Sequence, residues 1–338
     1  MLYVVSLVLL IAVLIHSYRY YVLHKSNEAN AMAPFDGDIY LLGNNVVAKR
    51  KLYGNPTKTV VCMPGFMETI AYYFDVYNDA DVDLILVNNG FYHSPLEDDN
   101  AIRPAWYDDN NPYELGTIEH DAYVLVQVLR HLPSTDHIIL HGHSRGGAVV
   151  LEAGRMLRMA GEPQEPQRYH AALLEAPVLP QGKARGHDAP LLIRIAIRYF
   201  MPLAFHQYRD NARLYLNFGG YKHPHTDVKA HILSQYFGNP KQYHITVTNI
   251  KNIDQWITHT DYSVFDSFSN VIALIPEKDI VLDRNAMLHS AMQSDNVKIK
   301  MAARTDHFIS LERPELIRQT VQEFFPNMQQ PNQIETAH

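Results

Sequence analysis

The chain has 338 residues, and 47% of them are hydrophobic, so it can form one large domain or two small ones around a sizeable core. Its net charge of −7 at pH 7 argues against nucleic acid as a partner, because there is no excess of Lys and Arg to neutralise phosphates. Cys62 is the only cysteine, which rules out an intramolecular disulfide, and its apolar surroundings predict a buried structural thiol.

An apolar segment begins the chain. Ser6 is the only polar residue between Leu2 and Ile15. A helix crosses a bilayer with about 17–25 apolar residues, and the segment reaches that length when it is counted through Leu23. We therefore expect a single N-terminal membrane anchor over residues 1–25. A cleaved signal peptide and a buried core helix are the alternatives that this pattern leaves open.

The residues that follow the apolar run bear on these alternatives. Arg19 lies within the apolar segment when that segment is counted through Leu23, and its side chain would snorkel to the membrane interface. Together with Lys25 it favours a cytoplasmic position for the rest of the chain. Ala29-Asn30-Ala31 resembles a cleavage site but lies far beyond the apolar run, and no basic residue precedes that run. The anchor is therefore the interpretation that we favour.

Short apolar segments come next and predict strands. Four of them precede the first long helix, at residues 36–42, 45–52, 57–63 and 83–87. Residues 88–111 are polar and carry two pairs of adjacent aspartates. We interpret them as a solvated loop rather than a cation site, because no known ligand spacing is present. Apolar residues at helical spacing then predict a helix over 113–131.

Gly142-His143-Ser144-Arg145-Gly146 is the most informative motif of the chain. It follows the apolar run Ile138–Leu140, which predicts a buried strand, and it precedes a helix predicted over 147–160. On such a strand-to-helix turn the serine hydroxyl is raised at the N-terminal end of the helix. Backbone N–H groups and the helix dipole there favour a developing negative charge. We therefore expect Ser144 to be a catalytic nucleophile.

Strands and helices continue to alternate in the second half of the chain. Further strands are predicted at residues 171–177, 271–275 and 296–301, and a last helix at 314–325. This alternation predicts an α/β fold, with a mainly parallel sheet and helices on both of its faces.

Residues 179–267 interrupt the alternation with a helix-like segment rich in aromatic side chains. Residues 191–205 within it are apolar on most sides and carry Arg194 and Arg198 one turn apart. Two interpretations remain equal: a lid that shields a lipophilic pocket or touches the membrane surface, and a buried helix whose arginines reach solvent. The expected units are an anchor (1–25), a core (36–178 and 268–326), a helical cap between two strands (179–267) and a frayed tail (327–338).

A serine hydroxyl needs a base within hydrogen-bond reach, and the base needs an orienting carboxylate. His307 is selected from 19 histidines by its position after the last strand and before the final helix. Asp279, in the loop after the preceding strand, is the preferred acid. Glu277, Asp283 and Glu175 are its rivals.

The expected oxyanion hole consists of two backbone N–H groups. Arg145, directly after the nucleophile, should provide one of them. Phe66, in the loop Met63–Thr69, should provide the other, with Met67 as the second choice. Gly65 permits the close backbone turn that this loop needs.

Taken together, these motifs resemble the capped, lipase- and esterase-like branch of the α/β-hydrolase superfamily. The similar segments are the oxyanion loop Pro64-Gly65-Phe66, the G-H-S-x-G-G elbow at 142–147, and the ending Asp306-His307-Phe308 with Leu311-Glu312-Arg313-Pro314. The resemblance covers residues 36–325. It implies an α/β-hydrolase fold with a helical cap and a triad of Ser144, Asp279 and His307.

Two positions depart from the family pattern. Arg145 replaces the apolar or Gln residue that commonly follows the nucleophile, and its guanidinium could bias the pocket toward an anionic substrate. Asp306 replaces a glycine and could crowd the histidine loop. His141 and His143 form an H-x-H pair, but no third ligand is evident, so we expect no metal.

The sequence therefore predicts a membrane-anchored serine hydrolase that needs no cofactor. It would cleave ester bonds of a lipophilic or acyl-containing small molecule through an acyl-enzyme. A thioester, an amide or a carbon–carbon bond next to a carbonyl stays open, because the same oxyanion chemistry serves all of them. A catalytically silent, membrane-tethered binding protein on the same fold is the alternative from another class. The oligomeric state is not indicated.

Overall fold

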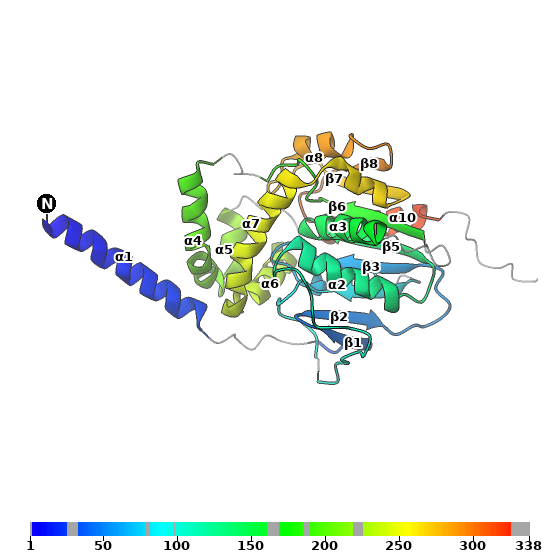
Figure 1. Cartoon of the computed structure of the whole chain (residues 1–338), viewed down its shortest axis with the longest axis horizontal. Coiled ribbons are helices and arrows are strands. Elements are labelled where there is room, and N and C mark those ends of the chain that lie inside the picture. Colours follow the sequence, from blue (N-terminus) through cyan, green and yellow to red (C-terminus); the bar gives the residue numbers. More distant parts are fainter. Residues whose placement is uncertain are drawn as a thin grey trace, which may run out of the picture.

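The computed structural model describes residues 2–25, 33–78, 81–97, 99–160, 169–184, 189–218 and 226–325. An eight-stranded sheet runs through them in the order β1-β2-β4-β3-β5-β6-β7-β8 (Figure 1). From β4 to β8 neighbouring strands are parallel, whereas β1, β2 and β4 pair antiparallel. The predicted, mainly parallel sheet is confirmed. The strands are β1 Gly37–Leu42, β2 Asn45–Arg50, β3 Thr59–Met63, β4 Asp83–Val87, β5 His137–His143, β6 Tyr169–Glu175, β7 Asn270–Pro276 and β8 Val297–Ala302.

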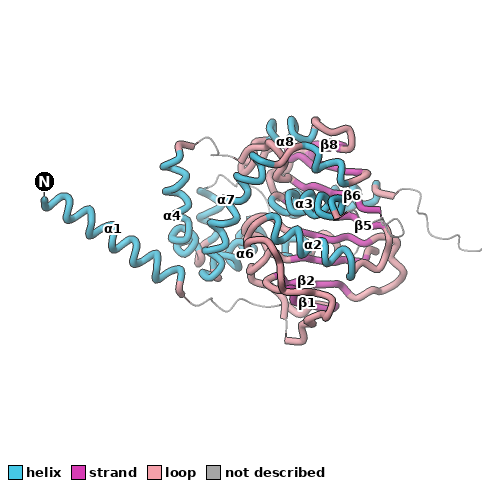
Figure 2. The backbone as a smooth tube through the Cα atoms, viewed as in Figure 1, coloured by secondary structure: helices cyan, strands magenta, loops and turns pink. Residues whose placement is uncertain are grey.

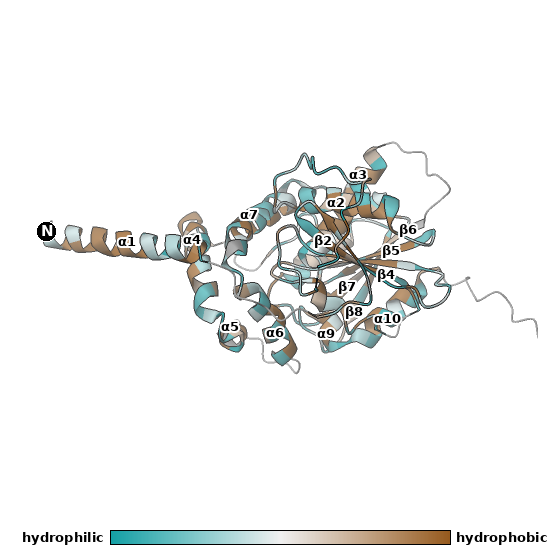
Figure 3. Cartoon of the chain, turned by 90° about the horizontal axis from the view of Figure 1, so that it is seen from below, coloured by the Kyte–Doolittle hydropathy of each residue, from teal (hydrophilic) through white to brown (hydrophobic). Residues whose placement is uncertain are grey.

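Helices cover both faces of the sheet (Figure 2 and Figure 3). One face carries α2 (Ile118–His131), α3 (Arg145–Met159) and α8 (Arg284–Ala291). The other carries the short helices η1 (Ile70–Tyr73) and α9 (Ile309–Glu312), and α10 (Pro314–Glu323).

The first of these helices, α2, begins later than the predicted residue 113. The Thr117 hydroxyl accepts the N–H of His120 and so caps the helix at Ile118. Helix α3 ends at Met159, one residue before its predicted end at 160, and the predicted tail 327–338 lies outside the described residues.

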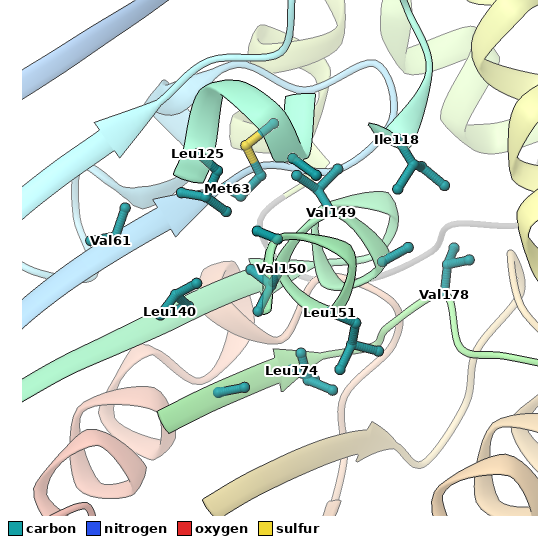
Figure 4. Packing of buried hydrophobic residues seen from close by; sticks show 14 of the residues in the cluster. Val61, Met63, Ile118, Leu125, Leu140, Val149, Val150, Leu151, Leu174 and Val178 are labelled. Atoms are coloured by element: carbon teal, nitrogen blue, oxygen red, sulfur yellow. The ribbon is translucent and has the colours of Figure 1, made fainter. Parts of the chain in front are cut away.

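Alternate residues of the central strands pack into two different layers. On β3, Val61 and Met63 belong to the layer with α2 and α3, whereas Val60 and Cys62 belong to the layer with α10. Figure 4 shows the first layer from close by, with apolar side chains of both helices against those of the strands. The Cys62 side chain is fully buried, as predicted, and burial raises the pKa of its thiol well above the usual value.

Four helices of the described chain separate β6 from β7. They are α4 (Leu191–Tyr208), α5 (Ala212–Phe218), α6 (Thr226–Phe237) and α7 (Tyr243–His259), and we call them the insertion helices. They lie together at one end of the sheet (Figure 1). The short helices η3 (Pro240–Gln242) and η4 (Tyr262–Ser267) flank α7. The insertion helices share a core rich in aromatic rings, among them Phe205, Tyr236 and Tyr243.

The first part of helix α4, up to Phe200, has its arginines turned inward and apolar side chains turned outward, whereas Phe205 near its end is buried. Arg198 donates to Asp254 of α7 at 2.5 Å, and Arg194 lies 3.8 Å from the same carboxylate. Leu192 is 79% exposed, and five further apolar residues of α4 are exposed with it. These are Leu191, Ile193, Ile195, Ile197 and Phe200. The interpretation of a buried helix whose arginines reach solvent is therefore wrong.

The N-terminal helix α1 (Leu2–Leu23) projects away from the rest of the molecule (Figure 1). Residues Tyr3–Leu23 are long and apolar enough to cross a membrane, and only the last two of them are buried. A core helix would be buried, so that alternative is wrong, whereas an anchor and a cleaved leader both fit. The cleavage-like residues 29–31 lie outside the described chain. Arg19 does not stand free, because its Nε donates to the backbone oxygen of Tyr199 on α4 at 3.0 Å.

The parallel strands place the predicted site residues on neighbouring loops. Loops that follow parallel strands all leave from the same edge of the sheet. Phe66 follows β3, Ser144 follows β5, Asp279 follows β7 and His307 follows β8. The fold therefore brings four distant sequence segments to one edge.

Candidate active site

Ser144 stands in a strained backbone conformation between β5 and α3. Its φ of 51° and ψ of −117° are unfavourable for a residue with a side chain. Three backbone hydrogen bonds hold it there. Its N–H donates to the carbonyl of Glu175 at 2.9 Å, and its own carbonyl accepts the N–H groups of Gly147 and Val178 at 3.0 and 2.9 Å. The turn is thus fixed by β6 and by the segment after it. Ser144 itself is 5% exposed.

Two glycines are required by the closeness of neighbouring atoms at this turn. A Cβ on Gly146 would lie 2.0 Å from the carbonyl oxygen of Met63, which ends β3. A Cβ on Gly65 would lie 3.0 Å from the Cβ of Ser144. The loop that follows β3 therefore runs directly beside the serine, and only glycine fits at these two positions.

His307 and Asp279 are brought together as predicted from the sequence. The Nδ1 of His307 lies 2.8 Å from Asp279 Oδ2, and both side chains are almost fully buried. The other oxygen of Asp279 accepts the N–H groups of Val281 and Leu282 at 2.7 and 2.8 Å. Burial by itself raises the pKa of Asp279, but His307 and these N–H groups outweigh it and lower the pKa. The carboxylate is thus ionised and fixed in position at neutral pH.

The three rival acids have other partners. Glu277 is exposed and accepts the N–H of Arg304 at 2.7 Å. Asp283 caps α8 by accepting the N–H of Ala286 at 2.8 Å. Glu175 is fully buried, but its carboxylate is taken up by His141, Tyr72 and Ser310 instead of His307.

Glu175 is a buried acid whose structural role the sequence did not reveal. It accepts the Tyr72 hydroxyl at 2.7 Å and the Ser310 hydroxyl at 2.6 Å, and it lies 2.9 Å from His141 Nε2. Burial by itself raises its pKa, but the neighbouring histidines and hydrogen bonds outweigh burial and lower the pKa to about 2. The carboxylate therefore joins β5, β6 and the segment that follows His307.

The predicted oxyanion loop bends sharply after β3. Gly65 donates its N–H to Glu68 Oε2 at 2.8 Å, and Met67 has a positive φ of 61°. The N–H of Met67 lies 3.4 Å from the Tyr92 hydroxyl. Phe66 lies between Gly65 and Met67 in the chain, and Arg145 is the first residue of α3. These are the two N–H groups that remain candidates for the oxyanion hole.

The guanidinium of Arg145 does not face a substrate pocket, so the expected bias toward anionic substrates is wrong. The side chain is fully buried, and its Nη1 donates to Asp121 at 2.7 Å and to Asn89 at 2.6 Å. Its Nη2 donates to the carbonyl of Gly116 at 3.2 Å. Burial by itself raises the pKa of Asp121, but Arg145 and further hydrogen bonds lower it to about 2. The Arg145 side chain therefore links α3 to α2 and to the loops that precede α2.

Asp306 takes part in a buried charge cluster that the sequence did not predict. Its two oxygens accept from Lys229 Nζ at 3.0 and 2.9 Å, and Glu312 accepts from the same ammonium at 2.6 Å. Burial by itself raises the pKa of Asp306, but Lys229 outweighs burial and lowers it. Lys229 lies on α6, so one ammonium joins the insertion helices to the loop of His307. Asp306 anchors this loop rather than crowding it.

Neither histidine of the H-x-H pair has a ring nitrogen directed to a shared metal position. His141 contacts Glu175 and the Tyr77 hydroxyl, and His143 contacts Glu68 and the carbonyl of His307. No group of three potential metal ligands lies close enough together anywhere in the described chain.

Replacing Lys229 by Met should destabilise the protein strongly. The change leaves two buried carboxylates without their cation, which costs about 3–5 kcal/mol in comparable cases. Urea unfolding measures this loss. Lys298→Met is the matched control, since Lys298 pairs with Glu323 in an exposed position and should cost less than about 1 kcal/mol. Equal losses in the two variants would contradict the assignment of a buried cluster.

The fold has many counterparts among solved structures, although no family model and no curated protein sequence matches the chain. Est816, described as an N-acyl homoserine lactone degrading enzyme, is 16% identical with a TM-score of 0.57, over 85% of this chain and 99% of that one. A thermophilic esterase from Thermogutta terrifontis is 15% identical with a TM-score of 0.56, over 84% and 94%. The N-formylmaleamic acid deformylase of Pseudomonas putida S16 is 12% identical with a TM-score of 0.53, over 82% and 95%. The sheet order, the elbow and these likenesses together show that the chain has the α/β-hydrolase fold.

Proposed function

We propose that this chain is a serine hydrolase that cleaves ester bonds of a lipophilic or acyl-containing substrate. The observation that carries the proposal is the buried His307–Asp279 pair, joined through the His307 carbonyl to His143, the residue before a strained, glycine-flanked Ser144. A nucleophile, a base and an orienting carboxylate in this chain order are the parts that acyl transfer needs. The esterase and the lactone-degrading enzyme among the structural neighbours act on bonds of the same kind.

The reaction follows from the roles of these groups. Ser144 Oγ attacks the ester carbonyl carbon while His307 Nε2 takes the hydroxyl proton, and Asp279 stabilises the imidazolium that forms. The N–H groups of Phe66 and Arg145 stabilise the oxyanion. The carbon–oxygen bond to the alcohol then breaks, and His307 gives its proton to the leaving oxygen. Water, deprotonated by His307, hydrolyses the acyl-enzyme and restores the serine.

Asp279→Asn should lower kcat by about 10⁴-fold, because the amide no longer holds the productive imidazole tautomer. Ser144→Ala should abolish both turnover of a nitrophenyl ester and labelling by a fluorophosphonate probe. Asp283→Asn is the matched control, since this carboxylate caps α8 and should leave the rate unchanged within about threefold. Labelling of Ser144→Ala at the wild-type rate would refute the proposal. Turnover of an amide panel but not of esters would reassign the bond.

We further propose that α1 anchors the protein in a bilayer and that the insertion helices form a cap over the site. Figure 3 shows α1 and α4 next to each other, both largely hydrophobic. The outward apolar face of α4 is unfavourable in water but suits the interface of the membrane that α1 would enter. A cavity of about 400 Å³ lies at the C-terminal end of α1, lined by Leu23, His24, Phe91, Leu115, His244 and Ile245. These surfaces support a lipophilic substrate. The cytoplasmic orientation stays a prediction.

A polarity-sensitive dye on α4 should report contact with lipid. The dye is attached to Leu192→Cys in full-length protein reconstituted into liposomes, with Cys62 replaced by Ala. We expect a blue-shifted emission that brominated lipids quench, because the apolar face of α4 would lie in the interface. Met292→Cys is the matched control, since Met292 is 72% exposed, against 79% for Leu192, but belongs to neither helix. Equal spectra at the two positions would refute membrane contact by α4.

A further inference from the structure

His143, the residue before the candidate nucleophile, faces a protein acceptor with each of its ring nitrogens. Its Nδ1 lies 2.7 Å from Glu68 Oε2, and its Nε2 lies 2.8 Å from the carbonyl oxygen of His307. A carbonyl oxygen and a carboxylate can only accept hydrogen bonds. A neutral imidazole has a single N–H, so the lone pair of its other nitrogen would face one of these acceptor oxygens without a hydrogen bond. With Glu68 ionised, both contacts are satisfied only when both nitrogens carry a proton.

We propose that His143 is a positioning residue, a doubly protonated imidazolium that ties the loops of the oxyanion donor and of the general base to the strand bearing Ser144. The proposal rests on the proposed function, because that function gives these loops their roles. One cation then joins three segments that are far apart in the sequence. These segments are β5, the loop that carries Phe66 and the loop that carries His307. Among the hydrogen bonds of the described residues, no other side chain from one of these segments contacts both of the other two.

The bond to Glu68 reaches the candidate oxyanion donor. Glu68 Oε2 also accepts the N–H of Gly65 at 2.8 Å, and Phe66 is the next residue. A carboxylate held by the imidazolium therefore fixes the Pro64–Gly65 peptide, which directly precedes the peptide that carries the Phe66 N–H. The bond to the His307 carbonyl fixes the backbone of the base in the same way, while Asp279 fixes its ring. Misplacement of such groups by about 1 Å can cost about 100-fold in rate.

The surroundings of His143 favour the charged form. Its ring is fully buried and stacks on Tyr72, with ring centroids 4.5 Å apart. The titratable groups that face it are Glu68 and Tyr72 from the loop and short helix after β3, Tyr73 from the same helix, Glu175 from β6, and His307. Burial by itself lowers the pKa of His143, but the Glu68 and Glu175 carboxylates outweigh it and raise the pKa to about 9. The positive charge persists through neutral pH.

His141, two residues earlier on β5, shows what an ordinary buried histidine looks like here. Its Nε2 lies 2.9 Å from Glu175, and its Nδ1 lies 2.8 Å from the Tyr77 hydroxyl, which can donate as well as accept. A neutral ring satisfies both contacts. Neither partner belongs to the oxyanion loop or to the His307 loop, so His141 is the matched control for burial without the bridge.

The first test is the pH dependence of kcat in the full-length protein with a nitrophenyl ester. A raised pKa means that the interaction is present at neutral pH and is lost as the pH rises through about 9, so kcat should fall there. In Glu68→Gln the carboxylate is gone and the pKa of His143 drops, so the midpoint of this fall should move down by at least about one pH unit. A merely structural role would lower the rate at every pH and leave the midpoint in place, and that result would overturn the proposal.

The second test needs no turnover and so separates this proposal from the proposed function. In ¹⁵N-histidine-labelled protein at pH 7, two ring N–H resonances should vanish together in His143→Gln. A single lost resonance would show a neutral ring and overturn the proposal even if the enzyme is active. Absence of wild-type turnover, with both resonances present, would instead count against the proposed function alone.

The third test compares His143→Gln with His141→Gln. Glutamine at position 143 can donate to one acceptor at most from the same place, so kcat should fall by about 100-fold while KM changes by less than about threefold. His141→Gln should lower thermal stability by a similar amount but keep most of the rate. Equal rate losses in the two variants would mean that His143 acts only through stability, which contradicts the bridge.

Discussion

Three backbone hydrogen bonds hold Ser144 at a φ of 51°, and the geometry of the site depends on them. Two of the three partners lie in β6 and the segment after it, so the turn cannot relax without disturbing the middle of the sheet. A strain of about 1–3 kcal/mol is tolerated at such a residue only when its neighbours determine its conformation. The contact of Gly146 with the end of β3 adds a second restraint. The serine is thus placed by the rigid part of the fold rather than by a loop.

Buried charges then connect this rigid turn to the looser segments around it. Arg145 holds the loops before α2, Glu175 holds the segment after His307, and Lys229 holds α6 to the same histidine loop. Each charge is paired and hydrogen-bonded, as burial demands. The result is a site in which Ser144 and His307 each lie next to a residue whose side chain belongs to a buried polar network.

The sequence allowed the sheet, the elbow and the pair His307–Asp279 to be predicted, because each has a local signal. Apolar runs mark strands, glycines mark the elbow, and position in the strand–helix alternation selects the histidine and the acid. The direction of the Arg145 side chain had no such signal, because its partner Asp121 lies on α2 and contact across that distance depends on tertiary packing. Lys229 was missed for the same reason. The outward face of α4 was left open because its arginines and its apolar residues alternate too closely for periodicity to tell inside from outside.

Because of Lys229, the ion pairs that hold α6 to the core differ in burial from those that hold α4 to α7. Moving α6 away from the core would bring an ammonium and two carboxylates into water and break their mutual contacts. Arg194 and Arg198 tie α4 to α7 through one partly exposed carboxylate, that of Asp254. Salt therefore screens the partly exposed pairs between α4 and α7, whereas it hardly affects the buried cluster around Lys229.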